Sequence, residues 1–288
     1  MKPDRASHTA EGAAAMRAAG CYERRSSLRN PDTLAQRLVR RRYRILVKYR
    51  AMRWATLRLY SSKLPGMYEA HLSRTHHYDA IVQDELGDGA DQYVVLGAGL
   101  DSRPYRLGLK RARVFEVDHP STSAFKRQRL AAAKIDHSQV TFVEVDFERE
   151  DLADRLLARG FDPSKRTLVT WEGVTMYLDR DSVGHVLAWV ASLGQGSSIV
   201  FDYVYPAFYE DPDRYRYARR HLEYVARAGE PYKFGLGFEA VSDFVGTYGL
   251  ELVSNHSASD LDNAYLAGHR GKTTPWYSVA RARTAKID

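Results

Sequence analysis

Short apolar runs separated by amphipathic stretches dominate the chain from residue 92 onward. Seven runs rich in β-branched and aromatic residues have the length of strands: Gln92–Leu96, Arg113–Val117, Val140–Val145, Thr167–Thr170, Ser198–Tyr203, Leu250–Ser254 and Trp276–Ala282. Amphipathic stretches near 101–109, 120–134, 150–159 and 180–193 predict helices between the first strands. Strands that alternate with helices favour a parallel sheet covered on both faces. We therefore predict a doubly wound α/β fold with a mostly parallel, seven-stranded sheet.

The pattern before residue 92 is helical. Apolar residues recur at helical spacing between 32 and 62, which predicts one or two helices, and Leu64-Pro65-Gly66 ends that pattern. A further helix is predicted over 67–87. Residues 1–30 are polar, small and without period, so they are expected to be disordered.

These patterns divide the chain into two ordered parts. Residues 31–90 are interpreted as a helical N-terminal cap, and residues 91–288 as the α/β domain. A stretch rich in Tyr and Arg at about 204–240 follows the fifth strand and is predicted to be a helical lid insertion.

Charge is distributed unevenly along the chain. The net charge is +7, but Arg24 to Lys63 holds 13 Lys or Arg and one acid, so this segment carries +12 and the remainder −5 (7 − 12). A uniformly basic nucleic-acid-binding protein would look different, so nucleic acid is not the expected partner. No apolar run approaches the roughly 18 residues of a membrane span. Cys21 is the single cysteine, which excludes an internal disulfide and fits a cytoplasmic location.

The first strand runs into a glycine turn, Gly97-Ala98-Gly99, which is followed by a predicted helix. Glycines there let the backbone approach a ligand closely, and a helix N-terminus offers free N–H groups. Because a tight strand-helix turn needs no ligand, the turn alone is weak evidence.

The second strand strengthens the interpretation. Asp118 follows the turn by about 20 residues, where a carboxylate can accept hydrogen bonds from two ribose hydroxyls. A pyrophosphate-binding fingerprint would have a third glycine where this chain has Ser102. S-Adenosylmethionine has a ribose but no phosphate, so the residues favour it over a nicotinamide dinucleotide.

Two later strands end in acids as well. Asp146 and Phe147 could hydrogen-bond and flank an adenine, which we favour over a role of Asp146 as the cap of the next helix. Glu172 follows the fourth strand at the edge where open α/β sheets bind ligands, and it could face the amino group of the cofactor.

Taken together, these segments resemble the leucine carboxyl methyltransferase family, in particular its bacterial branch of S-adenosylmethionine-dependent methyltransferases. The matching pieces are Leu72–Val82, Leu96–Leu107, Val114–Pro120, Val145–Phe147, Trp171–Leu178, Phe201–Tyr203 and Gly229–Gly235. The resemblance covers roughly residues 64 to 282 and implies a Rossmann-like fold of the class I methyltransferases. The basic stretch at 32–62 matches none of the family's motifs.

The resemblance also implies roles for individual residues. Arg74 would bind the methionine carboxylate, since a guanidinium fork can bind both oxygens, whereas by itself it would be a surface helix arginine. Gly97, Ala98 and Gly99 would lie under the methionine part, and Asp118 would take the ribose. Asp146 and Phe147 would hold the adenine, with Glu172 near the amino group. S-Adenosylhomocysteine would be the product, and no metal is implied.

The acceptor is expected to be a small molecule that is methylated on a carboxylate or hydroxyl oxygen. A carboxylate acceptor needs no base, whereas a hydroxyl benefits from one. His71, His76, His77 and His221 are candidate bases, but a structural role is favoured for each and no catalytic base is assigned. Tyr203 and Tyr209 could line the acceptor site beneath the predicted lid, although the same stretch fits an amphipathic helix whose aromatics pack on the core.

Two other functions stay open. The basic segment could track RNA phosphates, which would make the protein an RNA methyltransferase. Alternatively, it could bind an anionic membrane or a partner in a non-catalytic interaction protein. A cap with a solvated basic face is the interpretation we favour. The sequence carries no signal for an oligomeric state.

Overall fold

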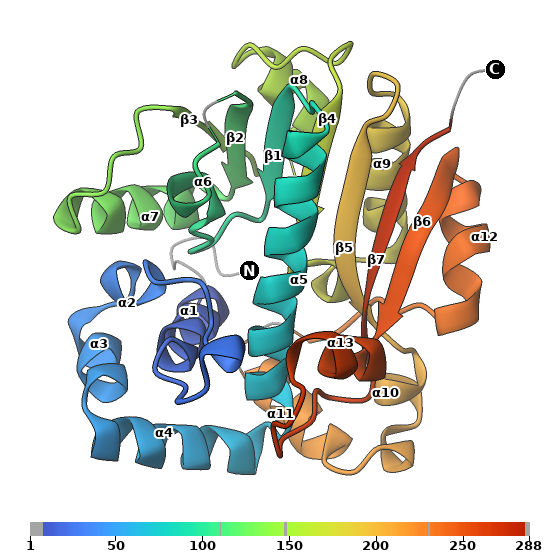
Figure 1. Ribbon diagram of the computed structural model, residues 1–288. Coiled ribbons are helices and arrows are strands. Elements are labelled where there is room, and N and C mark those ends of the chain that lie inside the picture. Colours follow the sequence, from blue (N-terminus) through green and yellow to red (C-terminus); the bar gives the residue numbers. More distant parts are fainter. Residues whose placement is uncertain (1–7, 110, 147–148, 228, 230, 286–288) are drawn as a thin grey trace.

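The computed structural model describes residues 8–109, 111–146, 149–227, 229 and 231–285 (Figure 1). Its centre is a seven-stranded sheet in the order β3-β2-β1-β4-β5-β7-β6. The strands are β1 (Gln92–Leu96), β2 (Arg113–Asp118), β3 (Val140–Glu144), β4 (Thr167–Trp171), β5 (Ser198–Val204), β6 (Leu250–Ser257) and β7 (Tyr277–Thr284). β1 to β5 are parallel, and β7 runs antiparallel to both of its neighbours. The predicted mostly parallel sheet is confirmed.

The strand order places the candidate residues at one edge of the sheet. β1 lies between β2 and β4, and Leu96 is in register with both Val117 and Trp171. The chain order of the strands reverses between β1 and β4, which is where open α/β sheets bind ligands. Consequently Gly97, Asp118 and Glu172, each of which follows one of these paired residues, meet at the carboxyl edge.

Helices cover both faces of the sheet (Figure 1). One face carries α5 (Met67–Gly87), α6 (Arg103–Arg106), α7 (Pro120–Ala132) and α13 (Ala258–Tyr265), and the other carries α8 (Leu152–Leu157), α9 (Arg180–Ala191) and α12 (Val241–Gly246). The helix predicted at 101–109 is only the single turn α6, since Gly108 at φ +67° bends the chain away. Because α5 packs Val82 against Tyr93 and Val95 of β1, it belongs to the sheet layers rather than to a separate cap.

The N-terminal segment differs from its prediction. Residues 8–20, which were expected to be disordered, form helix α1 (His8–Gly20), and its Ala14, Ala18 and Ala19 are at most 2% exposed. The side chains are too small to create an apolar period in the sequence, but they allow close approach to α5, where a Cβ on Gly20 would lie 2.4 Å from a methyl of Leu72. Tertiary packing therefore stabilises a helix that the local sequence pattern does not predict.

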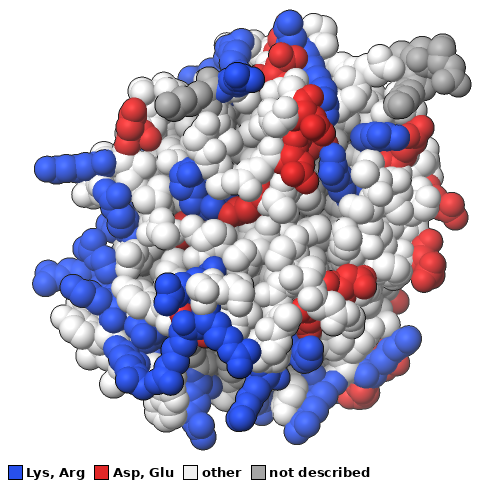
Figure 2. Space-filling model, viewed as in Figure 1, with Lys and Arg blue, Asp and Glu red and all other residues white. Residues whose placement is uncertain are grey.

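The stretch 32–62 forms three helices instead of one or two. They are α2 (Ala35–Leu38), α3 (Arg41–Lys48) and α4 (Arg50–Lys63), separated where Val39 and Tyr49 take extended backbone angles. Neither break has a Gly or Pro, so the sequence offered no signal for them. Lys and Arg side chains gather over α3 and α4, at the lower left of the molecule (Figure 2). No helix within the described ranges has the length and apolarity needed to cross a bilayer.

The segment after β5 contains α10 (Ala207–Glu210) and α11 (Ala218–Arg227) with short 3-10 turns. It is anchored by Phe208, whose ring stacks on Trp276 with centroids 4.4 Å apart. The Lys233 N–H donates to the Met176 carbonyl oxygen at 2.8 Å, which joins the end of this segment to the loop after β4.

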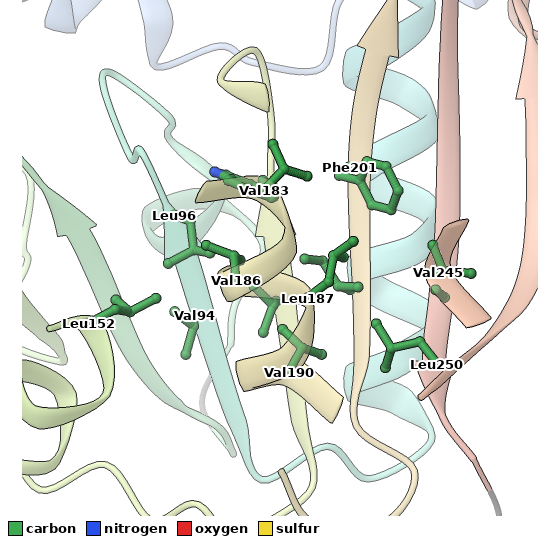
Figure 3. Packing of buried hydrophobic residues seen from close by; sticks show 14 of the residues in the cluster. Val94, Leu96, Leu152, Val183, Val186, Leu187, Val190, Phe201, Val245 and Leu250 are labelled. Atoms are coloured by element: carbon green, nitrogen blue, oxygen red, sulfur yellow. The ribbon is translucent and has the colours of Figure 1, made fainter. Parts of the chain in front are cut away.

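The largest cluster of buried apolar side chains lies between the sheet and α8, α9 and α12 (Figure 3). Val183, Leu187 and Val190 of α9 are fully buried in this cluster. They share it with Val94 and Leu96 of β1. This packing holds the ends of β1 and β4 in place at the candidate edge.

We expect Ala18→Leu to lower the free energy of unfolding by about 1–3 kcal/mol, because three added carbons must enter the packed surroundings of a fully buried position of α1. Ala13→Leu, at a half-buried position of the same helix, is the matched control and should cost less. Urea unfolding of both variants measures the difference. Equal stability of Ala18→Leu and the parent would contradict the packed position of α1.

Candidate functional site

The glycine turn after β1 is closely enclosed by the protein itself. Gly97 and Gly99 have φ angles of +62° and +42°, which favour glycine. A Cβ on Gly97 would lie 2.5 Å from a methyl of Val174 in the loop after β4, and one on Gly99 would lie 3.2 Å from the Cβ of Ala10 in α1. The turn is thus backed by the β4 loop and covered by α1.

Asp118 at the end of β2 is tied to this turn. Its Oδ2 accepts the Gly99 N–H at 2.6 Å, and its Oδ1 accepts the His119 N–H at 2.7 Å. Burial raises the pKa of Asp118, and these two hydrogen bonds act in the opposite direction. Each carboxylate oxygen has a second lone pair, so the group can also accept hydroxyl donors of a bound ligand.

A buried lysine contacts the backbone of the glycine turn. Lys126 of α7 places its Nζ 2.8 Å from Glu116 Oε1 and donates to the Ala98 carbonyl oxygen at 3.2 Å. Burial raises the pKa of Glu116 to about 7, while Lys126 lowers it. Sequence reasoning missed Lys126, although an acid in an apolar strand followed ten residues later by a helical lysine was a usable signal.

Glu172, after β4, is held between two arginines. Its Oε1 lies 2.8 Å from Arg74 Nε, and its Oε2 accepts from Arg103 Nη1 at 2.6 Å. Burial alone would raise the pKa of this carboxyl, but Arg103 and Arg74 outweigh burial and hold it at about 2. Glu172 is therefore ionised across the physiological pH range.

Arg74 itself has a second carboxylate partner. Its Nη1 donates to Asp202 Oδ2 of β5 at 2.8 Å, and Nη2 lies 3.3 Å from His71 Nδ1. The resemblance implies that Arg74 binds the methionine carboxylate, and the structure shows that Arg74 and Glu172 are also bound to each other. Asp202 was not singled out in the sequence, because nothing there indicates that β5 brings an acid under an arginine of α5.

The ion pairs continue around Glu172 as a buried network. Arg103 also contacts Asp79 and Asp101, at 2.8 and 2.7 Å, although its own side chain is only 2% exposed. Asp79 pairs with Arg106 as well. At the far end Arg17 of α1 donates to Asp32 at 2.8 Å and to the Leu100 carbonyl oxygen at 2.8 Å. The network thus joins α1, α5, α6 and the carboxyl ends of two strands. We name it the arginine–carboxylate network; its members are Arg17, Arg74, Arg103, Arg106, Asp32, Asp79, Asp101, Glu172 and Asp202.

The remaining candidates are placed differently. Asp146 follows β3, one strand beyond Asp118; its side chain is 33% exposed and lies 3.7 Å from Arg149. The N-cap of the next helix is Asp151, so capping is not the role of Asp146. Phe147 lies outside the described residues.

The two tyrosines expected near the acceptor are Tyr203, in β5, and Tyr209, in α10. Tyr203 is fully buried, and its hydroxyl donates to Asn255 Oδ1 of β6 at 2.9 Å. Tyr209 packs beside Gly235, with a ring carbon 3.1 Å from where a Cβ would stand. An acceptor contact of Tyr203 would require the side chain to leave this core position.

Two uncharged histidines are paired with tyrosines near the network. His71 Nε2 lies 3.3 Å from the Tyr60 hydroxyl, and burial, with Arg74 nearby, lowers the pKa of His71 well below 6.5. His221 Nε2 lies 3.1 Å from the Tyr232 hydroxyl, and burial lowers the pKa of His221 to about 4. Both imidazoles are therefore uncharged at neutral pH, and burial disfavours the protonated form of each. In the described part of the chain no three His, Cys, Asp or Glu side chains are grouped to hold a metal ion.

Comparison with known proteins bears on this site. The sequence model of the leucine carboxyl methyltransferase family matches residues 10–191. A Bacillus subtilis protein named "putative S-adenosyl-L-methionine-dependent methyltransferase YktD" is 29% identical over 212 residues, which cover 72% of this chain and 69% of that protein. A relative of the same description from Mycobacterium ulcerans is 37% identical over 52% of this chain. The chain spans about half the length of that relative (50%).

Solved structures share the fold. A protein from Thermobifida fusca, described as a "putative methyltransferase", aligns with a TM-score of 0.60 and 17% identity over 95% of this chain and 94% of its own. A duf574 family protein from Streptomyces avermitilis aligns with a TM-score of 0.58 and 18% identity over 83% of this chain and 92% of its own. At these identities the likeness shows the fold alone.

We expect Glu172→Gln to lower the free energy of unfolding by about 3 kcal/mol at neutral pH, because two buried guanidinium groups lose a shared carboxylate. The folded pKa of Glu172 lies below its usual value near 4.5, so its contribution is present above pH 4.5 and is lost as the pH falls toward 2. The stability difference between parent and variant should therefore shrink on acidification. Urea unfolding between neutral and acidic pH measures it.

Glu223→Gln is the matched control. Glu223 pairs with Arg227 at 3.2 Å on the surface of α11, and such an exposed pair contributes at most about 0.5 kcal/mol. A Glu172→Gln variant as stable as this control would show that the network does not depend on Glu172.

Proposed function

The chain belongs to the leucine carboxyl methyltransferase family of S-adenosylmethionine-dependent methyltransferases, and we propose that it methylates a carboxylate or hydroxyl oxygen of a small-molecule acceptor. The observation that carries the proposal is the composition of the carboxyl edge. An ionised acid, Glu172, and a second buried acid, Asp118, flank the glycine turn, and uncharged His71 lies beside the same network.

The residues at the edge fit the cofactor. Asp118 has lone pairs for two ribose hydroxyls, and ionised Glu172 suits the ammonium group of the methionine part. Arg74 would bind the methionine carboxylate through Nη2, since its other two nitrogens already face acids. Asp146 would lie farther along the edge, toward the adenine. The bound cofactor supplies a methyl group on a positively charged sulfur, which makes that methyl strongly electrophilic.

The protein's part in the transfer is to position the acceptor. The acceptor oxygen would form a bond to the methyl carbon while the electron pair of the carbon–sulfur bond returns to sulfur, so the two bonds must lie in line. α1 covers the glycine turn at Ala10, which keeps water from that side of the site. A carboxylate acceptor is ionised at neutral pH and needs nothing further.

A hydroxyl acceptor must also lose a proton. His71 and His221 are the candidates to take it, because each faces a tyrosine hydroxyl and is uncharged, while burial makes each a weaker base than a free imidazole. We propose the surroundings of Tyr60 and His71 as the acceptor side of the site. α4 and α5 border it, α11 contacts the end of α4 through Arg220 and the Ser62 carbonyl oxygen, and the segment after β5 would act as a lid.

Asp118→Asn should weaken S-adenosylhomocysteine binding at least about tenfold, because a neutral amide loses charge-assisted hydrogen bonds to the ribose. Isothermal titration calorimetry measures the dissociation constant, and Asp136→Asn, an exposed acid after α7, is the control. The thermal unfolding of both variants shows whether the turn is intact. Unchanged affinity in a folded Asp118→Asn variant would remove Asp118 from the cofactor site.

The chemistry of the product identifies the acceptor. We expect methyl-labelled S-adenosylmethionine to transfer label to small molecules of a cell extract, and a methyl ester would release labelled methanol in mild base whereas a methyl ether would not. Release by base would assign a carboxylate acceptor, and a base-stable product a hydroxyl.

Three other results would overturn this assignment. Label in material that ribonuclease degrades would support an RNA methyltransferase. Base-stable label on carbon or nitrogen of the purified product would exclude oxygen as the acceptor atom. No transfer by a protein that binds S-adenosylhomocysteine, across acceptor extracts active with other methyltransferases, would favour the interaction protein.

A further inference from the structure

The outer side of α3 and α4 exposes an unusual number of large apolar side chains. Ten large hydrophobic residues of the described chain are exposed, and five of them fall in positions 45–59: Ile45, Tyr49, Met52, Trp54 and Leu59. Trp54 is 64% and Leu59 is 58% exposed. α4 has no buried residue along its 14 positions, so much of its surface has no partner within the described chain.

Three of the other five lie beside these helices. The Arg53 guanidinium of α4 lies 4.3 Å from the ring centroid of Tyr22. Arg220 of α11 donates to the Ser62 carbonyl oxygen at the end of α4, and Tyr217 and Tyr224 flank that arginine in the chain. We call the exposed apolar groups of α3 and α4, together with Tyr22, Tyr217 and Tyr224 beside them, the α3–α4 surface. A cluster of exposed apolar side chains indicates a surface that binds a partner or a membrane.

The same surface is strongly basic. Residues 41–63 contain eight Lys or Arg and no acid. Of these eight, Arg42 alone has a carboxylate within 4 Å among the described residues, with Glu11 at 3.8 Å. Figure 2 shows these cations gathered over α3 and α4, and the rest of the chain is net acidic. The missing counter-charges point to an anionic partner.

The apolar and basic groups are arranged along α4 as on a helix that lies flat on a lipid surface. Met52, Ala55 and Leu59 are three and four residues apart, so they share one exposed face. Arg58 and Lys63 lie on either side of that face, and Arg50 is exposed at the start of the helix. Trp54 lies one turn before Arg58 and contacts it, and it is an amphipathic ring of the type found at the headgroup level of membranes.

The aromatic rings of this surface are poorly placed to stack on nucleic-acid bases. Cations already cover several faces: Arg58 lies 5.6 Å from the Trp54 ring centroid, Arg42 4.8 Å from that of Tyr43, and Arg53 4.3 Å from that of Tyr22. Single-stranded RNA stacks its bases on free aromatic faces, and aliphatic side chains such as Met52 and Leu59 add nothing to such stacking. A lipid surface uses the aliphatic groups and the cations together.

We propose that the α3–α4 surface docks the protein onto a membrane rich in anionic phospholipids, with Met52 and Leu59 inserted between headgroups and Trp54 at the level of the headgroups. The contact is peripheral, since α4 is short and lies along the surface. On its inner side α4 carries Tyr60, which faces His71, so the docking surface lies directly outside the proposed acceptor side. Docking itself does not depend on the methyl acceptor.

Vesicle flotation with the full chain tests the proposal. Vesicles of phosphatidylcholine mixed with phosphatidylglycerol should bind the protein, and vesicles of phosphatidylcholine alone should not. Replacing Arg50, Arg58 and Lys63 together by Gln should weaken binding about 100-fold, because each surface cation contributes to the attraction. Replacing Met52 and Leu59 together by Ser should weaken it about tenfold or more.

Matched variants separate docking from general effects of charge and apolarity. The apolar control combines Leu157→Ser with Val253→Ser, which removes two exposed apolar groups away from the α3–α4 surface. The charge control replaces Arg111, Arg159 and Lys165 by Gln, which removes three exposed cations away from that surface. Both should bind vesicles like the parent. Trp54 fluorescence should shift to shorter wavelength with anionic vesicles, and Trp54→Phe should lose this shift while still floating. S-Adenosylhomocysteine affinity and circular dichroism of every variant establish that the fold is intact.

Three outcomes would overturn the proposal. One is no flotation with anionic vesicles at low salt by a protein that binds S-adenosylhomocysteine. Another is binding that is the same in the Met52 and Leu59 variant as in the parent, which would leave a purely electrostatic contact without insertion. The third is salt-dependent binding to single-stranded RNA in the absence of vesicle binding, which would assign the surface to nucleic acid.

Discussion

Two buried guanidinium groups, those of Arg74 and Arg103, constrain the rest of the structure. A buried charge is tolerated only when it is paired and hydrogen-bonded, and these two share Glu172 and have further acids of their own. Each acid comes from a different element, so satisfying the arginines places α5, α6 and the ends of β4 and β5 relative to one another. The edge of the sheet next to the glycine turn is thereby shaped before any ligand arrives.

The network also explains why the N-terminal segment belongs to the site. Arg17 joins α1 to Asp32 and to the turn at Leu100, and Ala10 covers Gly99. The next helices turn outward, so α4 has an inner side at His71 and an outer side of unpaired cations and apolar groups. One stretch of sequence thus covers the glycine turn and forms the most distinctive surface of this methyltransferase.

Most of the sheet could be predicted from the sequence. Its buried strands are short apolar runs and the helices between them are amphipathic, so the local sequence pattern indicates which segments are buried. Five of the expected cofactor residues, Gly97, Ala98, Gly99, Asp118 and Glu172, lie at the predicted edge, since the ends of parallel strands must meet there. Arg74 reaches the same edge from helix α5. The order of α1 and the breaks at Val39 and Tyr49 were missed, because alanines and extended angles at ordinary residues leave no periodic signal.

The sequence by itself determined the fold class, the family and the strand ends that carry the chemistry, because these depend on residue type and short-range spacing. Only the tertiary structure decided which side chains form pairs. Arg74 meets Asp202 across 128 positions of chain, Tyr60 meets His71 between two helices, and Tyr203 is bonded to β6 inside the core. Such contacts arise from packing between distant elements, and a linear pattern records which side chains are available but not which of them share a buried space.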